Sequence, residues 1–198
     1  MHPVFSFISL IFASLLANLR LFMFVLDKEF QLFIPENKIQ ARIKELAQNI
    51  NGQYAGKNPL FVAILNGSFI FAADLIREIS IPCQISFIKT ASYENIQSTG
   101  NVRQLLGFNE PLENREVIII EDIVDTGNTL NSILVDIHKF KPSSVEIATL
   151  LFKPEALMHR IKPKFTGFEI PNKFVVGYGL DYNGHGRNLK DIYQLKNI

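Results

Sequence analysis

The sequence predicts an α/β fold, with a mostly parallel sheet flanked by helices. Apolar runs that read as strands alternate along the chain with segments of helical periodicity, and this alternation is typical of parallel sheets. The clearest strand, residues 117–120, consists of four β-branched residues, which suits a strand buried on both faces. A turn of small polar residues follows it, and then a helical pattern at Leu130, Ile133, Leu134 and Ile137.

The composition fits one domain with a sizeable core. The chain has 198 residues, of which 47% are hydrophobic. Lys and Arg total 20 against 19 Asp and Glu, so the net charge of +1 gives no general attraction to nucleic acid or to acidic membranes. Cys83 is the single cysteine, which excludes an intrachain disulfide and fits a reducing compartment.

The first 22 residues differ from the rest of the chain. Residues 4–19 carry no charge and are mostly Phe, Ile, Leu, Ala and Ser. A secretory signal lacks support, because there is no basic n-region and the cleavage site is poor. A membrane anchor would be short for a hydrocarbon core of about 30 Å. The third interpretation, which we favour, is a start codon assigned too early, with translation beginning at Met23. We therefore treat residues 1–22 as an apolar extension and 23–198 as a single domain.

The remaining elements follow from local patterns. Apolar positions four or three apart after Pro35 predict a helix that ends near Gly52, and Asn58-Pro59 breaks the chain before the next strand. The polar stretch 93–101 reads as a loop. In chain order, we expect helices over 36–52 and 69–79, strands over 60–65, 85–88 and 117–120, a helix from Leu130, and strands over 145–152 and 174–176.

Three polar positions each follow a predicted strand: Asn66, Glu121 and Lys153. In parallel α/β sheets ligands bind beyond the carboxyl ends of the strands. We therefore expect these three regions to meet at one edge of the sheet.

The segment after strand 117–120 predicts an anion site with carboxylates beside it. Glu121 and Asp122 come first, and Asp125-Thr126-Gly127-Asn128-Thr129 then leads into the helix. Free backbone N–H groups and the helix dipole converge at such a helix start. Carboxylates next to a phosphate cradle imply a metal ion or hydroxyl groups between them. A sugar phosphate would satisfy both halves of the site.

This order of residues resembles the ribose-phosphate signature of the type I phosphoribosyltransferases, which bind 5-phosphoribosyl-1-pyrophosphate (PRPP). Further stretches are similar to the hypoxanthine–guanine branch of that family, and together they cover essentially all of residues 23–198 in the family's order. These stretches are Leu65-Asn66-Gly67-Ser68, Ser92-Tyr93, Gln97-Ser98-Thr99-Gly100, Leu150-Leu151-Phe152-Lys153, residues 174–182 and Arg187.

The resemblance implies a type I phosphoribosyltransferase fold with a small hood over the purine site. It also implies Mg²⁺-dependent transfer of the 5-phosphoribosyl group from PRPP to N9 of hypoxanthine or guanine, giving IMP or GMP and pyrophosphate in purine salvage. Such glycosyl transfers pass through an oxocarbenium-like transition state.

For the signature, the resemblance implies a division of labour. Glu121 and Asp122 hold the ribose hydroxyls and the metal. Asp125 is the catalytic general base at purine N7, although an Asp at this position is also a common helix N-cap. Asp125 and the four residues after it, Thr126, Gly127, Asn128 and Thr129, bind the 5-phosphate.

For pyrophosphate, the resemblance points to the loop Leu65, Asn66 and Gly67, in which the family often has a cis peptide before the second residue, and to Arg187. Many relatives have a basic residue where Asn66 stands, so the backbone amides of this loop would carry the contact here. An ordinary strand-to-helix turn is the alternative for the loop, and a surface salt bridge is the alternative for Arg187.

For the purine, the resemblance implies that Lys153 donates to O6, that Phe174 stacks on the base and that Val175 contacts it through the backbone. Asp181 lies beside the purine and supplies a second metal contact. Ser92 and Tyr93 belong to a lid loop that closes over the site. Each has an ordinary alternative. Lys153 could be a surface lysine, Phe174 could be core packing, Asp181 could belong to a surface salt bridge, and the lid could be a plain exposed loop.

Two other functions share features of this sequence. A PRPP-sensing regulator that binds RNA or DNA would need a basic stripe, and a phosphoacceptor signalling domain would not explain residues 125–129. We expect the partners to be PRPP, hypoxanthine and guanine, with no nucleic acid and no membrane for residues 23–198. We also expect a cytoplasmic homodimer or homotetramer.

Overall fold

The computed structural model describes residues 21–90, 104–106 and 110–196. By its internal contacts the chain divides into two compact units. The larger unit is Asn37–Asn172, and the smaller unit combines the two ends of the chain, up to Glu36 and from Lys173 onward.

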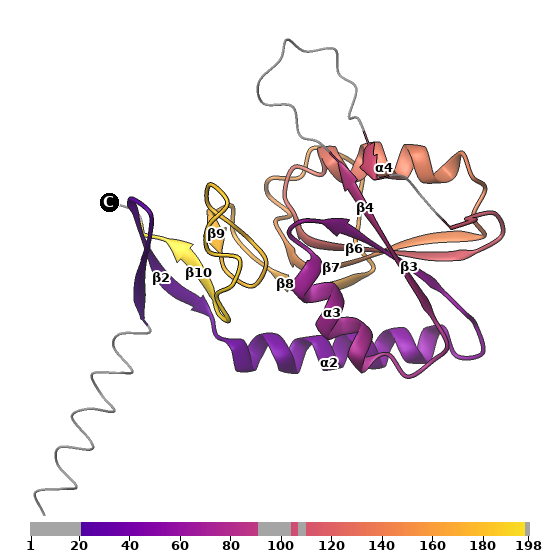
Figure 1. The fold of residues 1–198 in the computed structure, drawn as a ribbon, viewed down its shortest axis with the longest axis horizontal. Helices are drawn as coiled ribbons and strands as arrows, with labels where there is room; N and C mark the ends of the chain where they lie inside the picture. The colour runs from indigo at the N-terminus through magenta and orange to yellow at the C-terminus, as the bar shows by residue number, and fades with distance from the viewer. Residues whose placement is uncertain (1–20, 91–103, 107–109, 197–198) are drawn as a thin grey trace, which may run out of the picture. The chain divides into compact units, whose positions relative to one another are not determined.

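The larger unit is built on a six-stranded sheet (Figure 1). Its five neighbouring strands β4, β3, β6, β7 and β8 are parallel, and β5 pairs antiparallel with β4 at one edge. The predicted α/β fold with a mostly parallel sheet is therefore confirmed. In sheet order the strands are β5 (Gln104–Leu106), β4 (Gln84–Thr90), β3 (Leu60–Leu65), β6 (Glu116–Val124), β7 (Ser144–Phe152) and β8 (Phe165–Glu169).

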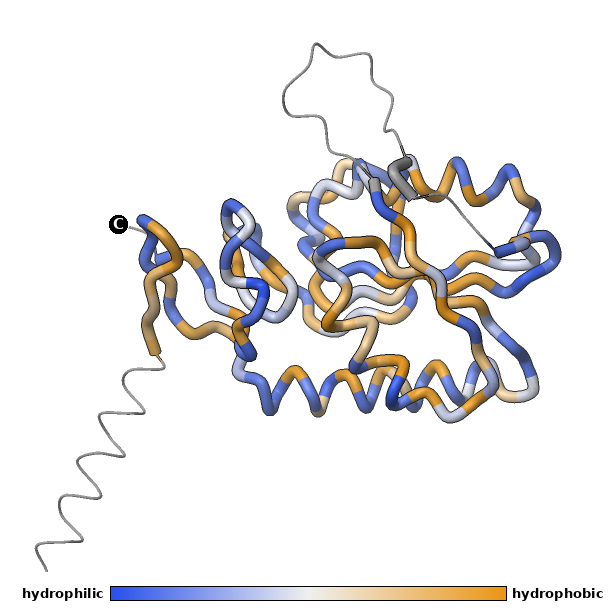
Figure 2. Tube along the Cα trace, viewed as in Figure 1, coloured by the Kyte–Doolittle hydropathy of each residue, from blue (hydrophilic) through white to orange (hydrophobic). Residues whose placement is uncertain are grey.

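Helices cover both faces of this sheet, with α4 on one face and α2 and α3 on the other (Figure 1). Their bounds are Glu36–Gln53 for α2, Phe69–Glu78 for α3 and Asn128–His138 for α4. The buried positions of α2 recur every three or four residues, which places them on one face of the helix. Figure 2 shows the result: hydrophobic and hydrophilic residues alternate along α2, while the central strands are largely hydrophobic.

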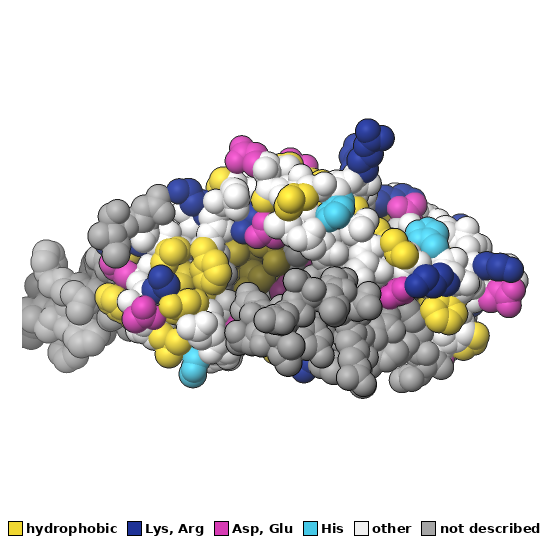
Figure 3. Space-filling view, turned by 90° about the horizontal axis from the view of Figure 1, so that it is seen from above, with side chains coloured by type: hydrophobic (Ala, Val, Ile, Leu, Met, Phe, Trp, Pro, Cys, Tyr) yellow, Lys and Arg dark blue, Asp and Glu magenta, His cyan; other side chains and the backbone are white. Residues whose placement is uncertain are grey.

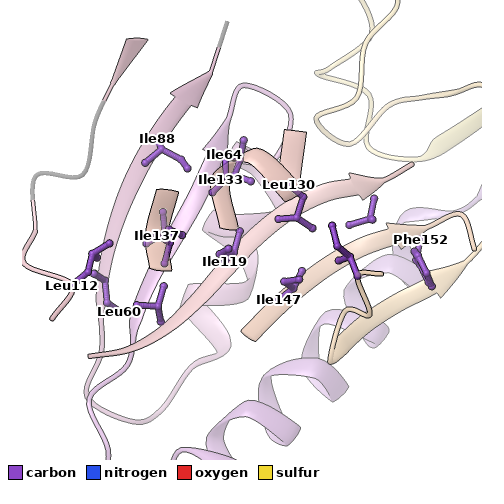
Figure 4. Packing of buried hydrophobic residues seen from close by; sticks show 14 residues of the cluster. Leu60, Ile64, Ile88, Leu112, Ile119, Leu130, Ile133, Ile137, Ile147 and Phe152 are labelled. Atoms are coloured by element: carbon purple, nitrogen blue, oxygen red, sulfur yellow. The ribbon is translucent and has the colours of Figure 1, made fainter. Parts of the chain in front are cut away.

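The core under α4 joins the helix to four strands (Figure 4). Leu130, Ile133 and Ile137 of α4 are at most 2% exposed and pack against apolar residues of β3, β4, β6 and β7. Branched aliphatic side chains dominate this cluster, so the strands that carry the polar site residues rest on a rigid, close-packed layer.

The smaller unit is a four-stranded antiparallel sheet in the order β1, β2, β10, β9. The strands are β1 (Phe22–Val25), β2 (Lys28–Ile34), β9 (Val175–Val176) and β10 (Ile192–Leu195). Val25, Phe30, Val176 and Tyr193 form its buried cluster. One short sheet therefore holds the two ends of the described chain together.

The structure confirms the predicted helices and central strands and corrects some of their bounds. Helix α2 passes Gly52 by one residue and ends at Gln53, and β9 begins at Val175, so Phe174 precedes it. The sequence patterns do not predict strands β1, β2, β5, β8 and β10, and β1 begins at Phe22, the last residue of the apolar extension. No helix that the structure describes is long and apolar enough to cross a membrane.

Candidate active site

Glu121 and Asp122 lie inside strand β6 and not after its end, which corrects the sequence prediction. Strand β6 continues to Val124, because Ile123 and Val124 still pair with Leu151 and Phe152 of β7. The apolar run ends at Ile120, but the strand pairing continues, because the hydrogen bonds between strands use backbone groups that every such residue has. The paired backbone of β6 therefore fixes the positions of both acidic residues.

Glu121 is a half-buried acid, and one of its two carboxylate oxygens is buried without a hydrogen-bond partner. Its Oε2 atom is the one buried side-chain oxygen or nitrogen without a partner in the described part of the chain. Burial, and secondarily the charge of Asp122, raise the pKa of Glu121 well above its ordinary value. A buried oxygen without a partner is costly, so this position calls for a donor or a cation from outside the protein.

Asp122 lies directly against the loop after β3. A Cβ atom built on Gly67 would lie 1.6 Å from Oδ2 of Asp122, so only glycine fits at this position. The other carboxylate oxygen, Oδ1, accepts a hydrogen bond from the backbone N–H of Ile123 at 2.9 Å. The acid pair on β6 and the predicted pyrophosphate loop are thus brought together.

The predicted pyrophosphate loop connects β3 to α3. Its Leu65–Asn66 peptide is cis, as the resemblance implies, and the Asn66 side chain is exposed. Ser68 closes the loop, because both its hydroxyl and its backbone N–H donate to the carbonyl oxygen of Ile64, at 2.5 and 3.4 Å. These bonds anchor the start of α3 to the end of β3.

The turn between β6 and α4 contains the predicted phosphate site. Gly127 caps the helix in a left-handed conformation, with φ of 79°. Asp125 is therefore not the helix N-cap, and this alternative is wrong: the cap lies two residues later and makes no side-chain bond. The first N–H groups of a helix have no partner further back in the helix, and here they belong to Asn128 and Thr129.

Lys153 directly follows β7 and is the single buried charged residue in the described ranges, at 5% exposure. Its ammonium group donates to Oδ2 of Asp125 at 2.7 Å. Its backbone N–H donates to the carbonyl oxygen of Val124 at 2.9 Å. Asp125 and Lys153, which directly follow the neighbouring strands β6 and β7, are thus joined by an ion pair.

One residue at this site was missed by the sequence reasoning. His159 lies in the segment after Lys153, and its Nε2 atom is 2.6 Å from Oδ1 of Asn128 in the phosphate turn. The two residues are 31 positions apart, and no spacing pattern in the sequence signals the contact.

In the smaller unit, Phe174 is an exposed aromatic ring held by other rings. It is 45% exposed, and its ring centroid lies 6.3 Å from that of Phe30 and 5.9 Å from that of Tyr182. Val175 next to it is buried and pairs with Gln194 of β10. Neighbouring rings therefore hold one side of the Phe174 ring, and another part of it is accessible to solvent. Its role is not simply core packing.

Asp181 and Arg187, also in the smaller unit, form an ion pair with each other. Nη2 of Arg187 lies 2.5 Å from Oδ1 of Asp181, and Nη1 donates to the carbonyl oxygen of Gly179 at 2.7 Å. The second carboxylate oxygen of Asp181 accepts from the backbone N–H of Gly184 at 2.6 Å. Both side chains are thus oriented by internal bonds.

The lid loop and the metal site are the two remaining predicted features. Ser92 and Tyr93 of the predicted lid loop lie outside the described residues. The described ranges contain no group of three or more His, Cys, Asp and Glu side chains that could hold a metal ion.

Comparison with known proteins identifies the family. Residues 35–183 match the phosphoribosyl transferase domain family. A hypoxanthine-guanine phosphoribosyltransferase of Lactococcus lactis is 40% identical over 173 residues, which cover 86% of this chain and 94% of the relative. A hypoxanthine phosphoribosyltransferase of Salmonella typhimurium is 40% identical over 162 residues, which cover 80% and 91%.

Solved structures agree with these matches. The crystal structure of a hypoxanthine phosphoribosyltransferase from Staphylococcus aureus superposes with a TM-score of 0.79 at 42% identity, covering 84% of this chain and 91% of that one. The sequence matches show the family, and the structural match shows that its fold is present. The chain belongs to the hypoxanthine–guanine phosphoribosyltransferases, within the type I phosphoribosyltransferase family.

Proposed function

We propose that this chain carries out the purine salvage reaction of its family with the residues described above. Hypoxanthine or guanine attacks C1 of PRPP through N9, and IMP or GMP and pyrophosphate are formed. The observation that carries the assignment of residues is the ion pair between Lys153 and Asp125, a buried cation and a carboxylate beside a phosphate-type turn.

The pair of Lys153 and Asp125 suits a 6-oxopurine. The ammonium group has three donors and no acceptor, so it selects an oxygen at purine position 6 and disfavours the amino group of adenine. The carboxylate accepts the proton from N7 as N9 forms its bond to C1. Because each group is already held by the other, both are oriented before substrate binds.

Glu121 and Asp122 are proposed to hold the ribose hydroxyls and Mg²⁺. The fit is supported by the buried, partnerless Oε2 of Glu121 and by the oxygen-only donor set. Mg²⁺ usually takes one or two carboxylates and completes its shell with substrate oxygens and water, so a cluster of three protein ligands is not needed. When bound, the ion would neutralise charge on the departing pyrophosphate.

The turn from Asp125 to Thr129 is proposed to bind the 5-phosphate. The backbone N–H groups of Asn128 and Thr129 and the hydroxyls of Thr126 and Thr129 supply donors, and the helix dipole of α4 adds a favourable field. The side chain of Thr126 also orders the turn, since Oγ1 accepts from the N–H of Asn128 at 3.4 Å.

The loop of Leu65, Asn66 and Gly67 is proposed to bind pyrophosphate through backbone amides. Asn66 offers no positive charge, so the anion must draw cationic help from elsewhere. Arg187 is suited to that role, because a guanidinium group binds phosphate oxygens in a bidentate manner.

The smaller unit is proposed to supply the other purine contacts. Phe174 stacks on the base with its exposed ring, and Val175 contacts the base through its backbone. Asp181 offers a second carboxylate to the metal. Both Asp181 and Arg187 are paired with each other in this structure, so each would exchange or share that partner when ligand binds.

The charge on one described face favours an enzyme over a nucleic-acid-binding regulator. On the face drawn in Figure 3, basic and acidic side chains are interspersed over the described surface, and no basic stripe crosses it. We expect a cytoplasmic enzyme, since a reducing compartment fits the lone Cys83. We also expect a homodimer or homotetramer.

The test uses the purified full chain with PRPP and Mg²⁺. Hypoxanthine, guanine, xanthine and adenine are offered separately, and nucleotide formation is followed by absorbance. We expect turnover of hypoxanthine and guanine, with adenine inert. Turnover of adenine at a comparable rate, or binding of PRPP without turnover of any base, would contradict the proposal.

A further inference from the structure

We propose that His159 is a positioning residue for the phosphate turn and acts through the side-chain amide of Asn128. The inference rests on the proposed function, in which residues 125–129 bind the 5-phosphate of PRPP.

The hydrogen bond between the two side chains has a defined direction. Nε2 of His159 lies 2.6 Å from Oδ1 of Asn128. The amide oxygen can only accept, so Nε2 of His159 carries the hydrogen and donates it. This donor is present both in the neutral Nε2–H tautomer and in the imidazolium ion.

This bond decides which end of the Asn128 amide is available to an anion. His159 binds the amide oxygen, Oδ1. It therefore makes no use of the two N–H donors on the amide nitrogen, Nδ2. An amide turned the other way would present a partial negative charge to phosphate. His159 thus selects the rotamer of Asn128 that suits an anion at the start of α4.

The segment around His159 also holds the turn by two other contacts. We call residues 154–161 the brace segment. The backbone N–H of Met158 donates to the carbonyl oxygen of Thr126 at 3.0 Å. Leu157 and Ile161 lie over Gly127, 3.0 and 3.4 Å from the place where a Cβ would stand. Glycine at that position lets the brace segment approach the turn.

The brace segment begins immediately after Lys153, which is itself paired with Asp125. The phosphate turn is therefore held at its first residue by Lys153 and at its fourth residue by His159. The first contact is proposed to bear on the purine chemistry. The second contact bears on the phosphate, so its loss should act on PRPP binding and leave the chemical step largely intact.

The experiment compares two substitutions of His159 that differ in hydrogen bonding. His159→Leu removes the donor and keeps an apolar side chain, and His159→Gln keeps an N–H donor. The control is His138→Leu: His138 is an exposed histidine at the far end of α4 whose Nδ1 donates to the carbonyl oxygen of Leu134 at 2.6 Å. The KM for PRPP, the kcat with hypoxanthine and the thermal unfolding midpoint are measured for each full-length variant.

We expect His159→Leu to raise the KM for PRPP about five- to tenfold with kcat changed less than about twofold, as for the loss of one hydrogen bond. We expect His159→Gln to recover most of that loss and His138→Leu to show none. In an Asn128→Ala background, His159→Leu should have no further effect on KM, because the two residues act through one contact.

An unchanged KM in His159→Leu, equal losses in the Leu and Gln variants, or a full effect in the Asn128→Ala background would each overturn the inference. The outcome is separable from that of the proposed function. If the wild-type chain binds PRPP but turns over no base, the proposed function fails. Calorimetric titration then gives the Kd for PRPP of the same variants. The fold-changes expected for KM are expected for Kd, and they decide the role of His159.

Discussion

Lys153 donates to Asp125 across a distance of 2.7 Å, yet the side chain of Lys153 is 7% exposed and that of Asp125 is 43% exposed. The pair joins the residues that directly follow two neighbouring strands, β6 and β7. A buried ammonium group is tolerated only with a partner that compensates for its lost hydration. Asp125 is that partner. Its carboxylate is the more exposed of the two groups, so a substrate can also reach it.

Replacing Lys153 should abolish the preference for 6-oxopurines. We expect Lys153→Ala to lower kcat/KM for hypoxanthine and guanine roughly 10- to 100-fold or more, as for the loss of a charged hydrogen bond. The exposed Lys162, replaced by Ala, serves as the control. Steady-state kinetics with each base measure the effect, and equal turnover in Lys153→Ala would refute the role of this residue.

Replacing the carboxylate should act on the chemical step. Asp125→Asn keeps the shape and an acceptor for Lys153 but cannot take up a proton. We expect kcat to fall roughly 10²- to 10⁴-fold, as for the loss of a general base, with the KM for PRPP changed far less. Asp136→Asn is the matched control, because Asp136 of α4 forms a surface ion pair with Lys139, just after the helix. A larger change in PRPP affinity than in kcat would assign Asp125 to binding alone.

Much of the larger unit could be predicted from the sequence, because its signals are local. Strand β3 has the expected bounds, and α3 differs from the expected helix by one residue, since apolar runs and helical periodicity are visible in short windows. The carboxylates Glu121 and Asp122 were placed after the strand, because polar residues usually mark a strand end. Pairing with β7 decides otherwise, and that pairing is not local.

The smaller unit and the contacts around the phosphate turn could not be predicted in this way. Strand β2 pairs with β10 across about 160 residues of sequence, and neither strand shows the regular alternation of a half-buried strand. The contact of His159 with Asn128 and that of Gly67 with Asp122 depend on how separate loops pack. The resemblance to a family supplied the identities of the site residues, and the structure supplied these contacts.

The close approach of Gly67 to Asp122 can be tested with a single methyl group. Because a Cβ at Gly67 would lie 1.6 Å from Oδ2 of Asp122, Gly67→Ala must displace the carboxylate or the loop. We expect a loss of about 1–3 kcal/mol in the free energy of unfolding and a fall of roughly 100-fold in kcat/KM. Gly52→Ala, at a helix position with nothing within 4 Å, should leave activity unchanged. Wild-type activity in Gly67→Ala would show that Asp122 need not stay where it lies.

Glu116, at the opposite end of β6 from the acid pair, allows stability to be changed without changing the site. Lys57 donates to its Oε1 at 2.7 Å and Ser144 donates to its Oε2, and these two bonds lower the pKa of Glu116 below its ordinary value of 4.5. A lowered pKa means that the folded protein favours the ionised acid, so the stabilisation is present above the unfolded-state pKa and is lost as the pH falls through the folded-state value. We expect Glu116→Gln to reduce the free energy of unfolding by about 0.5–1 kcal/mol at neutral pH and the difference from wild type to shrink as the pH falls through the lowered folded-state pKa of Glu116. Urea unfolding of both proteins across this pH range measures the difference, and kcat should stay unchanged. A difference that does not depend on pH would mean that the charge of Glu116 contributes nothing to stability.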